Sequence, residues 1–493
     1  MTGAAPRGGA GMNGAAGGGP APGSGSPGAG AGAIVQYALL AGPLLSMVDS
    51  SIVNVAAEPI ARALHASLGA VQWTVSGYLL GLGTGLAGTA YLARRYGTVP
   101  VYRASLAAFT TASALCALSP GIGALIAFRA VQGLVAAPLV PLAMSMLLGK
   151  DGRARSISVA AGIMLFAAPA LGPTVGGALI GAAGWRLIFA VNVPLGVCAV
   201  WAAKRLPGQP AAPVRDDTEF DLPGLVMLGG GVTLVLLGIS QGGSDGWGSA
   251  ACLGPLAAGA VLLAAYGRWA AGRAQPALDL SLFRQAVPAL SMGLCALAAV
   301  VTWTAVFLLP VFTQAVQGRS ALAAGIAMAP QGIVTGLSTA VGQRGLLTRF
   351  TIRATVCAGF VILGAGSLLL LTVGAATPLW VIAVILAVRS ASIGLVITPL
   401  LSALTGPLPP DRMGDASTLF NVVERIAGSF GIGLLASLYG TVARSAAGPA
   451  DALHVTGTVL ACVAAGGAAL AVLLPAVRNT AILSDREPAD ITP

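Results

Sequence analysis

Fourteen apolar runs, each close to the length that crosses a lipid bilayer, limit the folds open to this chain. A transmembrane helix needs about 20 mostly apolar residues, because each residue adds about 1.5 Å along the axis. The chain is 56% hydrophobic and only 9% charged, which excludes a water-soluble domain of 493 residues. The runs lie near 34–57, 71–92, 101–119, 122–148, 157–183, 186–203, 223–242, 250–270, 287–313, 323–342, 354–374, 378–402, 416–440 and 454–476. The sequence therefore predicts an all-α polytopic membrane protein with 14 transmembrane helices.

Two polar breaks divide these runs into groups of six, two and six. The longer break mixes basic and acidic residues with prolines, as is typical of a solvated linker. A six-plus-six arrangement suits transporters that are built from related halves. The predicted segments are a disordered tail (1–33), an N-terminal six-helix bundle (34–203), a cytoplasmic linker (204–222), two additional helices (223–270), a cytoplasmic loop (271–286), a C-terminal six-helix bundle (287–476) and a cytoplasmic tail (477–493).

Basic residues favour one side of the membrane. With both termini in the cytoplasm, 19 of the 26 Lys and Arg residues fall on the cytoplasmic side and four fall outside. This positive-inside pattern predicts a multi-pass protein of the cell membrane with cytoplasmic termini. The net charge of +10 then needs no nucleic acid partner, since the basic residues form no continuous stripe. The Ala-, Gly- and Arg-rich, Lys-poor composition points to a GC-rich bacterial genome.

Charged residues inside the runs are the candidates for function. A charge at the bilayer centre costs about 2.5–3.5 kcal/mol on the lenient insertion scale, so it usually faces a cavity or a partner. Asp49 in the first run and Arg129 in the fourth lie at similar depth, which allows them to pair. We interpret Asp49 as the proton-coupling acid beside Arg129; a fixed structural ion pair is the alternative. Glu424, beside Arg425, is a second candidate for proton coupling, although a local or gate-side ion pair is the favoured interpretation.

A substrate cavity is expected to involve the ninth and twelfth runs. Aromatic walls with a few polar groups suit lipophilic ligands, although aromatic residues in such runs also face lipid. Arg389, midway along the twelfth run, could meet an anionic group or carbonyl oxygens. The cavity candidates are Asp49, Trp303, Phe307, Phe312, Gln314 and Arg389. No cysteine has metal-ligand spacing, so neither a metal nor a cofactor is expected.

The fifth run is rich in glycine and proline. Its small and helix-bending residues are Pro169, Gly172, Pro173, Gly176 and Gly177. Gly172 and Gly176 share a helix face, and Pro173 removes a backbone donor. We expect a bent helix whose flat face slides or rocks against a partner; ordinary close helix packing is the alternative.

Several motifs together resemble the 14-span drug:proton antiporters of the major facilitator superfamily. The resemblance rests on Asp49, on Arg129 with Gln132, on the Gly-Pro element of the fifth run, and on W-R-x-x-F-x-x-N-x-P-x-G at 185–196. It implies two six-helix bundles plus two extra helices. It also implies a monomer that exports lipophilic small molecules, such as antibiotics, in exchange for protons by alternating access. Such a protein is a secondary active transporter and not an enzyme.

One loop departs from the family pattern. Arg94, Arg95 and Gly97 lie in the stretch between the second and third runs that forms part of a cytoplasmic gate in the family. Arg94 replaces the acid of that gate, so the latch must differ here. Two other functions stay open at this point: an uptake symporter on the same fold, and a non-transporting membrane sensor or scaffold.

Overall fold

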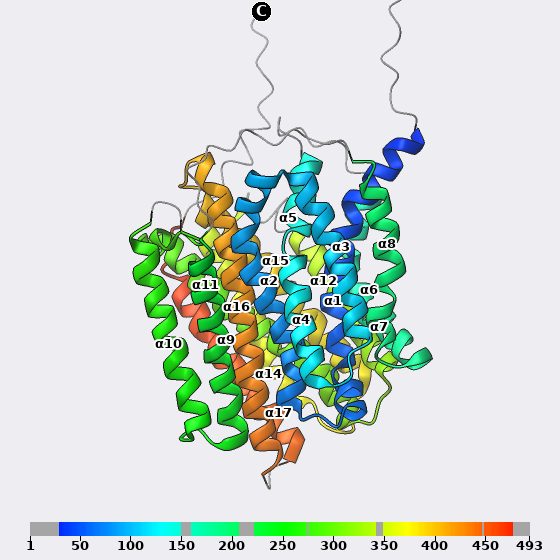
Figure 1. The fold of residues 1–493 in the computed structure, drawn as a ribbon. Coiled ribbons are helices and arrows are strands. Elements are labelled where there is room, and N and C mark those ends of the chain that lie inside the picture. The colour runs from blue at the N-terminus through cyan, green and yellow to red at the C-terminus, as the bar shows by residue number, and fades with distance from the viewer. Residues whose placement is uncertain are drawn as a thin grey trace, which may run out of the picture.

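Helices are the regular elements of the computed structural model, which describes residues 29–148, 159–206, 221–273, 276–341, 349–445 and 448–476. They are α1 (Ala29–Ala63), α2 (Leu68–Tyr96), α3 (Thr98–Ala117), α4 (Ile122–Ala136), α5 (Leu139–Leu148), α6 (Val159–Ala183), α7 (Leu187–Ala190), α8 (Asn192–Ala203), α9 (Leu222–Asp245), α10 (Ala250–Ala271), η1 (Leu280–Arg284), α11 (Ala286–Ala315), α12 (Ala321–Val341), α14 (Ile352–Leu368), η3 (Leu369–Thr372), α15 (Leu379–Thr405), α16 (Pro410–Ala443) and α17 (Gly448–Ala471). Each predicted run coincides with one helix or with two in succession (Figure 1). The all-α membrane fold is thus confirmed.

The described helices differ in how strongly they indicate a membrane span. Ten are long and apolar enough to cross a bilayer, or eleven if the bent pair Leu171–Ala183 and Leu187–Ala203 forms one span. This pair bends by 119°, which turns the chain back as two successive helices of a bundle require. α2 also matches a predicted run but is less apolar, because it buries Gln72, Thr74 and Ser76. The total of 14 stays a prediction.

The two additional helices form a hairpin at the edge of the molecule. α9 packs against α2 and α16, whereas α10 packs mainly on α9 (Figure 1). Asp221 is the N-cap of α9 and accepts a hydrogen bond from the Gly224 backbone N–H at 3.0 Å. The same carboxylate accepts from Trp269 Nε1 at 2.8 Å and from the Ala277 N–H at 3.0 Å. One acid therefore ties the start of α9 to the end of α10 and to the loop that follows.

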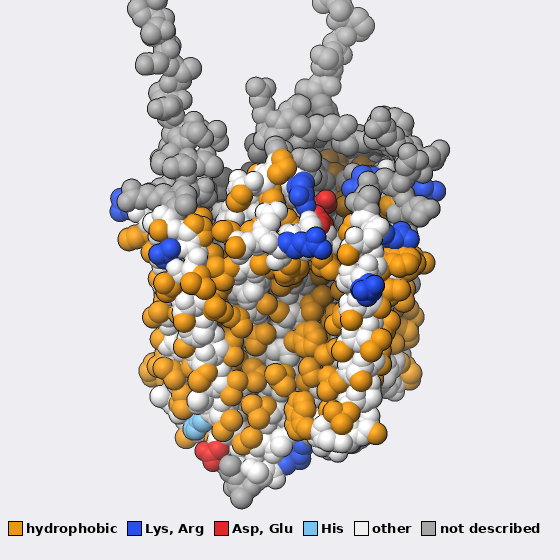
Figure 2. Space-filling model, turned by 90° about the vertical axis from the view of Figure 1, so that its left-hand side faces the viewer, with side chains coloured by type: hydrophobic (Ala, Val, Ile, Leu, Met, Phe, Trp, Pro, Cys, Tyr) orange, Lys and Arg blue, Asp and Glu red, His pale blue; other side chains and the backbone are white. Residues whose placement is uncertain are grey.

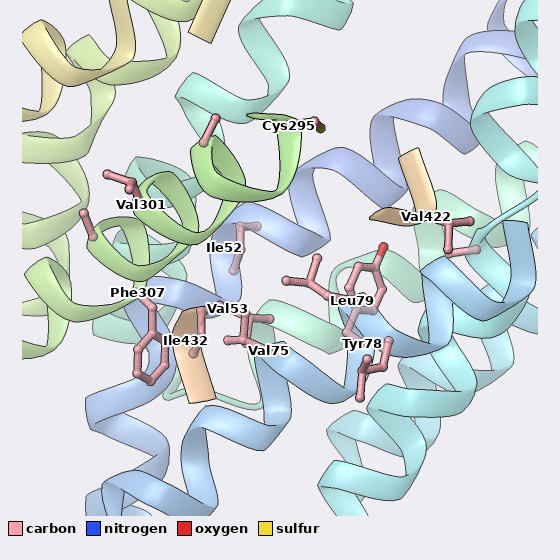
Figure 3. Close-up of a cluster of buried hydrophobic side chains, with 14 of the residues drawn as sticks. Ile52, Val53, Val75, Tyr78, Leu79, Cys295, Val301, Phe307, Val422 and Ile432 are labelled. Carbon is pink, nitrogen blue, oxygen red and sulfur yellow. The ribbon is translucent and has the colours of Figure 1, made fainter. Parts of the chain in front are cut away.

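Apolar side chains fill the interface between the N-terminal and C-terminal halves. Figure 3 shows residues from α1, α2, α11 and α16 converging there, including Val53, Val75, Phe307 and Ile432. Polar bonds cross the same interface. Gln314 Nε2 donates to the Val55 carbonyl at 2.9 Å. The halves are therefore packed together, with little water to screen charges in the interior.

Charge is segregated along the molecule. Figure 2 shows basic side chains gathered near one end, above a wide hydrophobic belt. Residues 1–28, 207–220 and 477–493, which contain most of the predicted tails and linker, lie outside the described residues. α1 begins at Ala29, so the last five residues of the predicted tail belong to this helix.

Candidate functional site

Asp49 and Arg129 form a buried ion pair, as their similar depth in the sequence allows. Arg129 Nη1 lies 2.5 Å from Asp49 Oδ2, and both side chains are 1% exposed. Asp49 belongs to α1 and Arg129 to α4, so the pair joins two helices of the N-terminal half. The pair carries no net charge. Its burial therefore costs less free energy than the burial of either charge alone.

Amide side chains complete the shell around the carboxylate. Asn192 Nδ2 of α8 donates to Asp49 Oδ1 at 2.8 Å, and Gln132 Nε2 of α4 donates to the same oxygen at 3.2 Å. Gln132 also donates to Ser113 Oγ of α3 at 2.7 Å and accepts from Arg129 Nη1 at 2.7 Å. Both carboxylate oxygens are therefore satisfied, which fixes Asp49 among α1, α3, α4 and α8.

Arg129 has its own neutral supports. Its Nε donates to the Thr74 carbonyl of α2 at 2.9 Å. Its Cζ lies 4.1 Å from the centre of the Tyr78 ring, close enough for a cation–π contact. The Tyr78 hydroxyl in turn hydrogen-bonds Ser46 Oγ of α1 at 3.0 Å. If Asp49 takes up a proton, the charge of Arg129 loses its counter-ion inside a network that involves five helices, α1, α2, α3, α4 and α8.

The glycines of α6 bring that helix against both halves of the protein. A Cβ at Gly172 would lie 1.9 Å from Ser51 Oγ, and one at Gly176 would lie 2.9 Å from Ile52 Cγ2, both on α1. A Cβ at Gly177 would instead lie 2.5 Å from the Ala321 carbonyl oxygen of α12. Thr174 Oγ1 donates to the Gly325 carbonyl of α12 at 3.1 Å. Pro169 and Pro173 lie in the same helix, the side chain of Pro169 falling outside the described residues.

The predicted cavity residues occupy different surroundings. Phe307 is fully buried in the interface between the halves (Figure 3). Trp303 packs under Gly428, where a Cβ would lie 2.5 Å from its Cδ1. Gln314 borders a cavity of about 650 Å³ between α1, α6 and the α11–α12 connection. Arg389 borders a separate small cavity in the C-terminal half. The structure does not bring these four side chains to one cavity, and Phe312 is fully buried as well.

Glu424 and the adjacent Arg425 do not form an ion pair with each other. In the described part of the chain, the Glu424 carboxylate has neither a hydrogen bond nor an ion pair. Arg425 instead places its Cζ 5.3 Å from the centre of the Trp303 ring. Adjacent residues of a helix point to different faces, which explains why these two charges do not meet.

The departing loop lies at the basic end of the molecule. Arg94 and Arg95 are in the last turn of α2, and Gly97 joins α2 to α3 with φ 89°. Only glycine adopts that conformation without strain. Arg94 borders a cavity of about 690 Å³ that also touches Asp279 and Asp415. Asp279 forms an ion pair with Arg412 of α16.

Sequence reasoning named Asp49 and Arg129 but gave no site role to the groups around them. Gln132 could have been found, because it follows Arg129 by three residues and shares its helix face. Ser113 and the Thr74 carbonyl carry no such signal, since their contacts depend on how three helices pack. In the described residues no group of three or more His, Cys, Asp or Glu side chains is arranged to hold a metal ion.

The chain is similar to known transport proteins over most of its length. A family model described as Major Facilitator Superfamily matches residues 39–432. A multidrug resistance protein B homolog of Mycobacterium tuberculosis is 31% identical over 403 residues, covering 80% of this chain and 74% of the relative. The cephamycin export protein of Amycolatopsis lactamdurans is 32% identical over 446 residues, covering 87% of this chain and 89% of the relative.

A solved structure has the same fold. An auto-inhibited peptide transporter of the POT family superposes with a TM-score of 0.65 at 13% identity, covering 93% of this chain and 99% of that one. At this low identity the likeness extends to the fold alone.

Proposed function

Because the chain belongs to the Major Facilitator Superfamily, in its multidrug efflux type, we propose that it exports lipophilic small molecules such as antibiotics in exchange for protons. Membership makes it a multi-pass membrane transporter rather than an enzyme. Export is supported by the names of its relatives, which describe drug resistance and antibiotic export. Proton exchange is supported by one observation, the buried Asp49–Arg129 pair.

Asp49 has the properties that a coupling acid needs. It is the one carboxylate inside the described helices that is almost fully buried, at 1% exposure. Its charge is balanced by Arg129 and stabilised by Asn192 and Gln132. Protonation of Asp49 removes this balance, so the protonated and the ionised states of the protein favour different arrangements of α1, α4 and α8. A proton can drive a conformational change only through such a difference in interaction energy.

Alternating access requires that the two halves move against each other. The glycine face of α6 contacts α1 of its own half and α12 of the other half. Small residues let helices lie close without interlocking side chains, which suits a rocking contact. We place the basic end of the molecule in the cytoplasm, so that Gln314 and the α6–α12 contact close the outer side. In this scheme one monomer binds substrate from inside and a proton from outside, each excluding the other.

The test is uphill transport by purified protein in proteoliposomes with an imposed pH gradient. Asp49→Asn should abolish substrate accumulation against a gradient, while substrate exchange without any gradient persists because binding is intact. Glu58→Gln is the matched control, since Glu58 lies nine residues along the same helix and pairs only with the exposed Arg62. Undiminished uphill transport by Asp49→Asn would remove Asp49 from the coupling role.

A further inference from the structure

The C-terminal half contains a buried arginine that has no acidic partner. Arg389 lies midway along α15 and is 4% exposed. Its Nη1 donates to Ser367 Oγ of α14 at 2.5 Å, and its Nη2 donates to the Val301 carbonyl of α11 at 2.8 Å. Both acceptors are neutral. Among the described residues no carboxylate forms an ion pair with Arg389.

The groups that contact this arginine lie at positions that match groups of the Asp49–Arg129 network in the other half. Asp49 is the sixteenth residue of the span Ile34–Ala63, and Val301 is the sixteenth residue of the span Ala286–Ala315. At the point where the first span of the N-terminal half supplies a carboxylate, the first span of the C-terminal half supplies only a backbone carbonyl.

The serines follow the same repeat. Ser113 is the sixteenth residue of α3 and Ser367 the sixteenth of α14. Ser113 reaches the Asp49 network through Gln132, whereas Ser367 binds Arg389 directly. Two copies of one arrangement thus differ in charge: the N-terminal copy is neutral, and the C-terminal copy carries one positive charge.

An unbalanced cation at this depth is costly. Even the lenient insertion scale assigns an arginine at the bilayer centre about 2.5–3.5 kcal/mol. Hydrogen bonds to a hydroxyl and a carbonyl orient the guanidinium but do not neutralise it. A mobile anion is the remaining means of balance.

A small cavity lies beside Arg389, where an anion could bind. It measures about 10 Å³, enough for one water-sized particle, and is bordered by Arg389, Thr302, Ser390 and Gln331. Gln331 Oε1 is buried there without a hydrogen-bond partner. Turning this amide by 180° exchanges its oxygen for an N–H donor. The cavity then offers a guanidinium, two hydroxyls and an amide, which is a set of donors suited to an anion.

We propose that the Arg389 cavity binds a monovalent anion, either chloride or the carboxylate of the transported molecule. The carboxylate source rests on the proposed export function, whereas anion binding itself does not. The cavity is now only about the size of a water molecule, so the lining side chains must move apart to admit either anion.

Thermal unfolding of the full chain in lipid nanodiscs tests anion binding. Chloride or formate should raise the unfolding midpoint in a saturable way when it replaces gluconate at constant ionic strength. Arg389→Gln should weaken the apparent anion affinity at least about tenfold, the loss expected for a charge-assisted bond. Arg353→Gln is the matched control, since Arg353 Nε also donates to a backbone carbonyl, that of Leu474, at 2.6 Å. An equal anion response in the wild type and in Arg389→Gln overturns the proposal.

A second variant covers the case in which Arg389→Gln does not fold. Thr302→Asp places a carboxylate beside the same cavity and so supplies a counter-ion for Arg389. This variant should fold with no response to chloride or formate, because Arg389 is already balanced. A chloride response that persists in Thr302→Asp also contradicts the proposal.

Competition separates the two sources of the anion. Two results together identify the carboxylate of the transported molecule as the anion. Octanoate displaces chloride, and Arg389→Gln lowers the export of a carboxylate-bearing probe but not that of its methyl ester. Chloride stabilisation without competition by octanoate identifies an inorganic anion. Asp49→Asn should keep the anion response even where it loses uphill transport, so failure of the export mechanism is distinguishable from failure of this site.

Discussion

Removal of both charges from the Asp49–Arg129 pair should destabilise the protein by less than the sum of the two single removals. Asp49→Asn leaves Arg129 buried without a counter-ion, and Arg129→Met leaves the buried Asp49 carboxyl with only two amide donors. Breaking a buried pair from one side costs about 3–5 kcal/mol. In the double variant no unbalanced charge remains, so its cost should fall below the sum of the two single costs by about 2–3 kcal/mol.

The free energy of unfolding of purified protein in mixed micelles, followed by helical circular dichroism, measures this cycle. Unfolding by a denaturing detergent must be reversible for all four proteins. Additive costs, or a cost below about 1 kcal/mol for Asp49→Asn, would show that the two charges are not coupled in the folded protein. The structural basis of the proton-coupling proposal would then be absent.

Three further outcomes follow from local geometry. Gly177→Val should lower transport more than tenfold, since even a Cβ would lie 2.5 Å from the Ala321 carbonyl, whereas Gly181→Ala, with open space around it, should transport normally. Burial alone would raise the pKa of Asp221, but its hydrogen bonds outweigh burial and lower that pKa. The stability that these bonds contribute is therefore present above about pH 4 and is lost on further acidification. The unfolding midpoint of Asp221→Asn should accordingly fall less on acidification than that of the wild type. Gly97→Ala should cost about 1–2 kcal/mol in the same unfolding assay, because φ is 89° there; an unchanged stability would contradict the strain.

The helices could be predicted from the sequence because burial in lipid leaves a direct mark on composition. Long apolar runs locate α11 and α15 with boundaries close to those observed, whereas α1 extends beyond its predicted run at both ends. The break near residue 184 could also be predicted, because Gly184 lies between two apolar runs. In the structure this glycine has φ 82°. Boundaries were less certain where polar residues face the bundle interior, as in α2.

The site could be predicted only in part. A carboxylate in an apolar run is rare enough to identify Asp49, and equal depth suggested Arg129. The family motif at 185–196 includes Asn192, but its contact with Asp49 depends on how α8 packs against α1, which the motif does not reveal. The same limit applies to Trp303 and Phe307, because an aromatic residue in a span suits a cavity wall, a packed interface and lipid equally.

Proton release on substrate binding tests the central claim most directly. Purified wild-type protein in weakly buffered detergent solution should release protons when an exported antibiotic is added, because substrate and proton exclude each other. Asp49→Asn should bind the same antibiotic without release, and Glu58→Gln should behave as the wild type. Equal proton release by Asp49→Asn and the wild type would contradict the account.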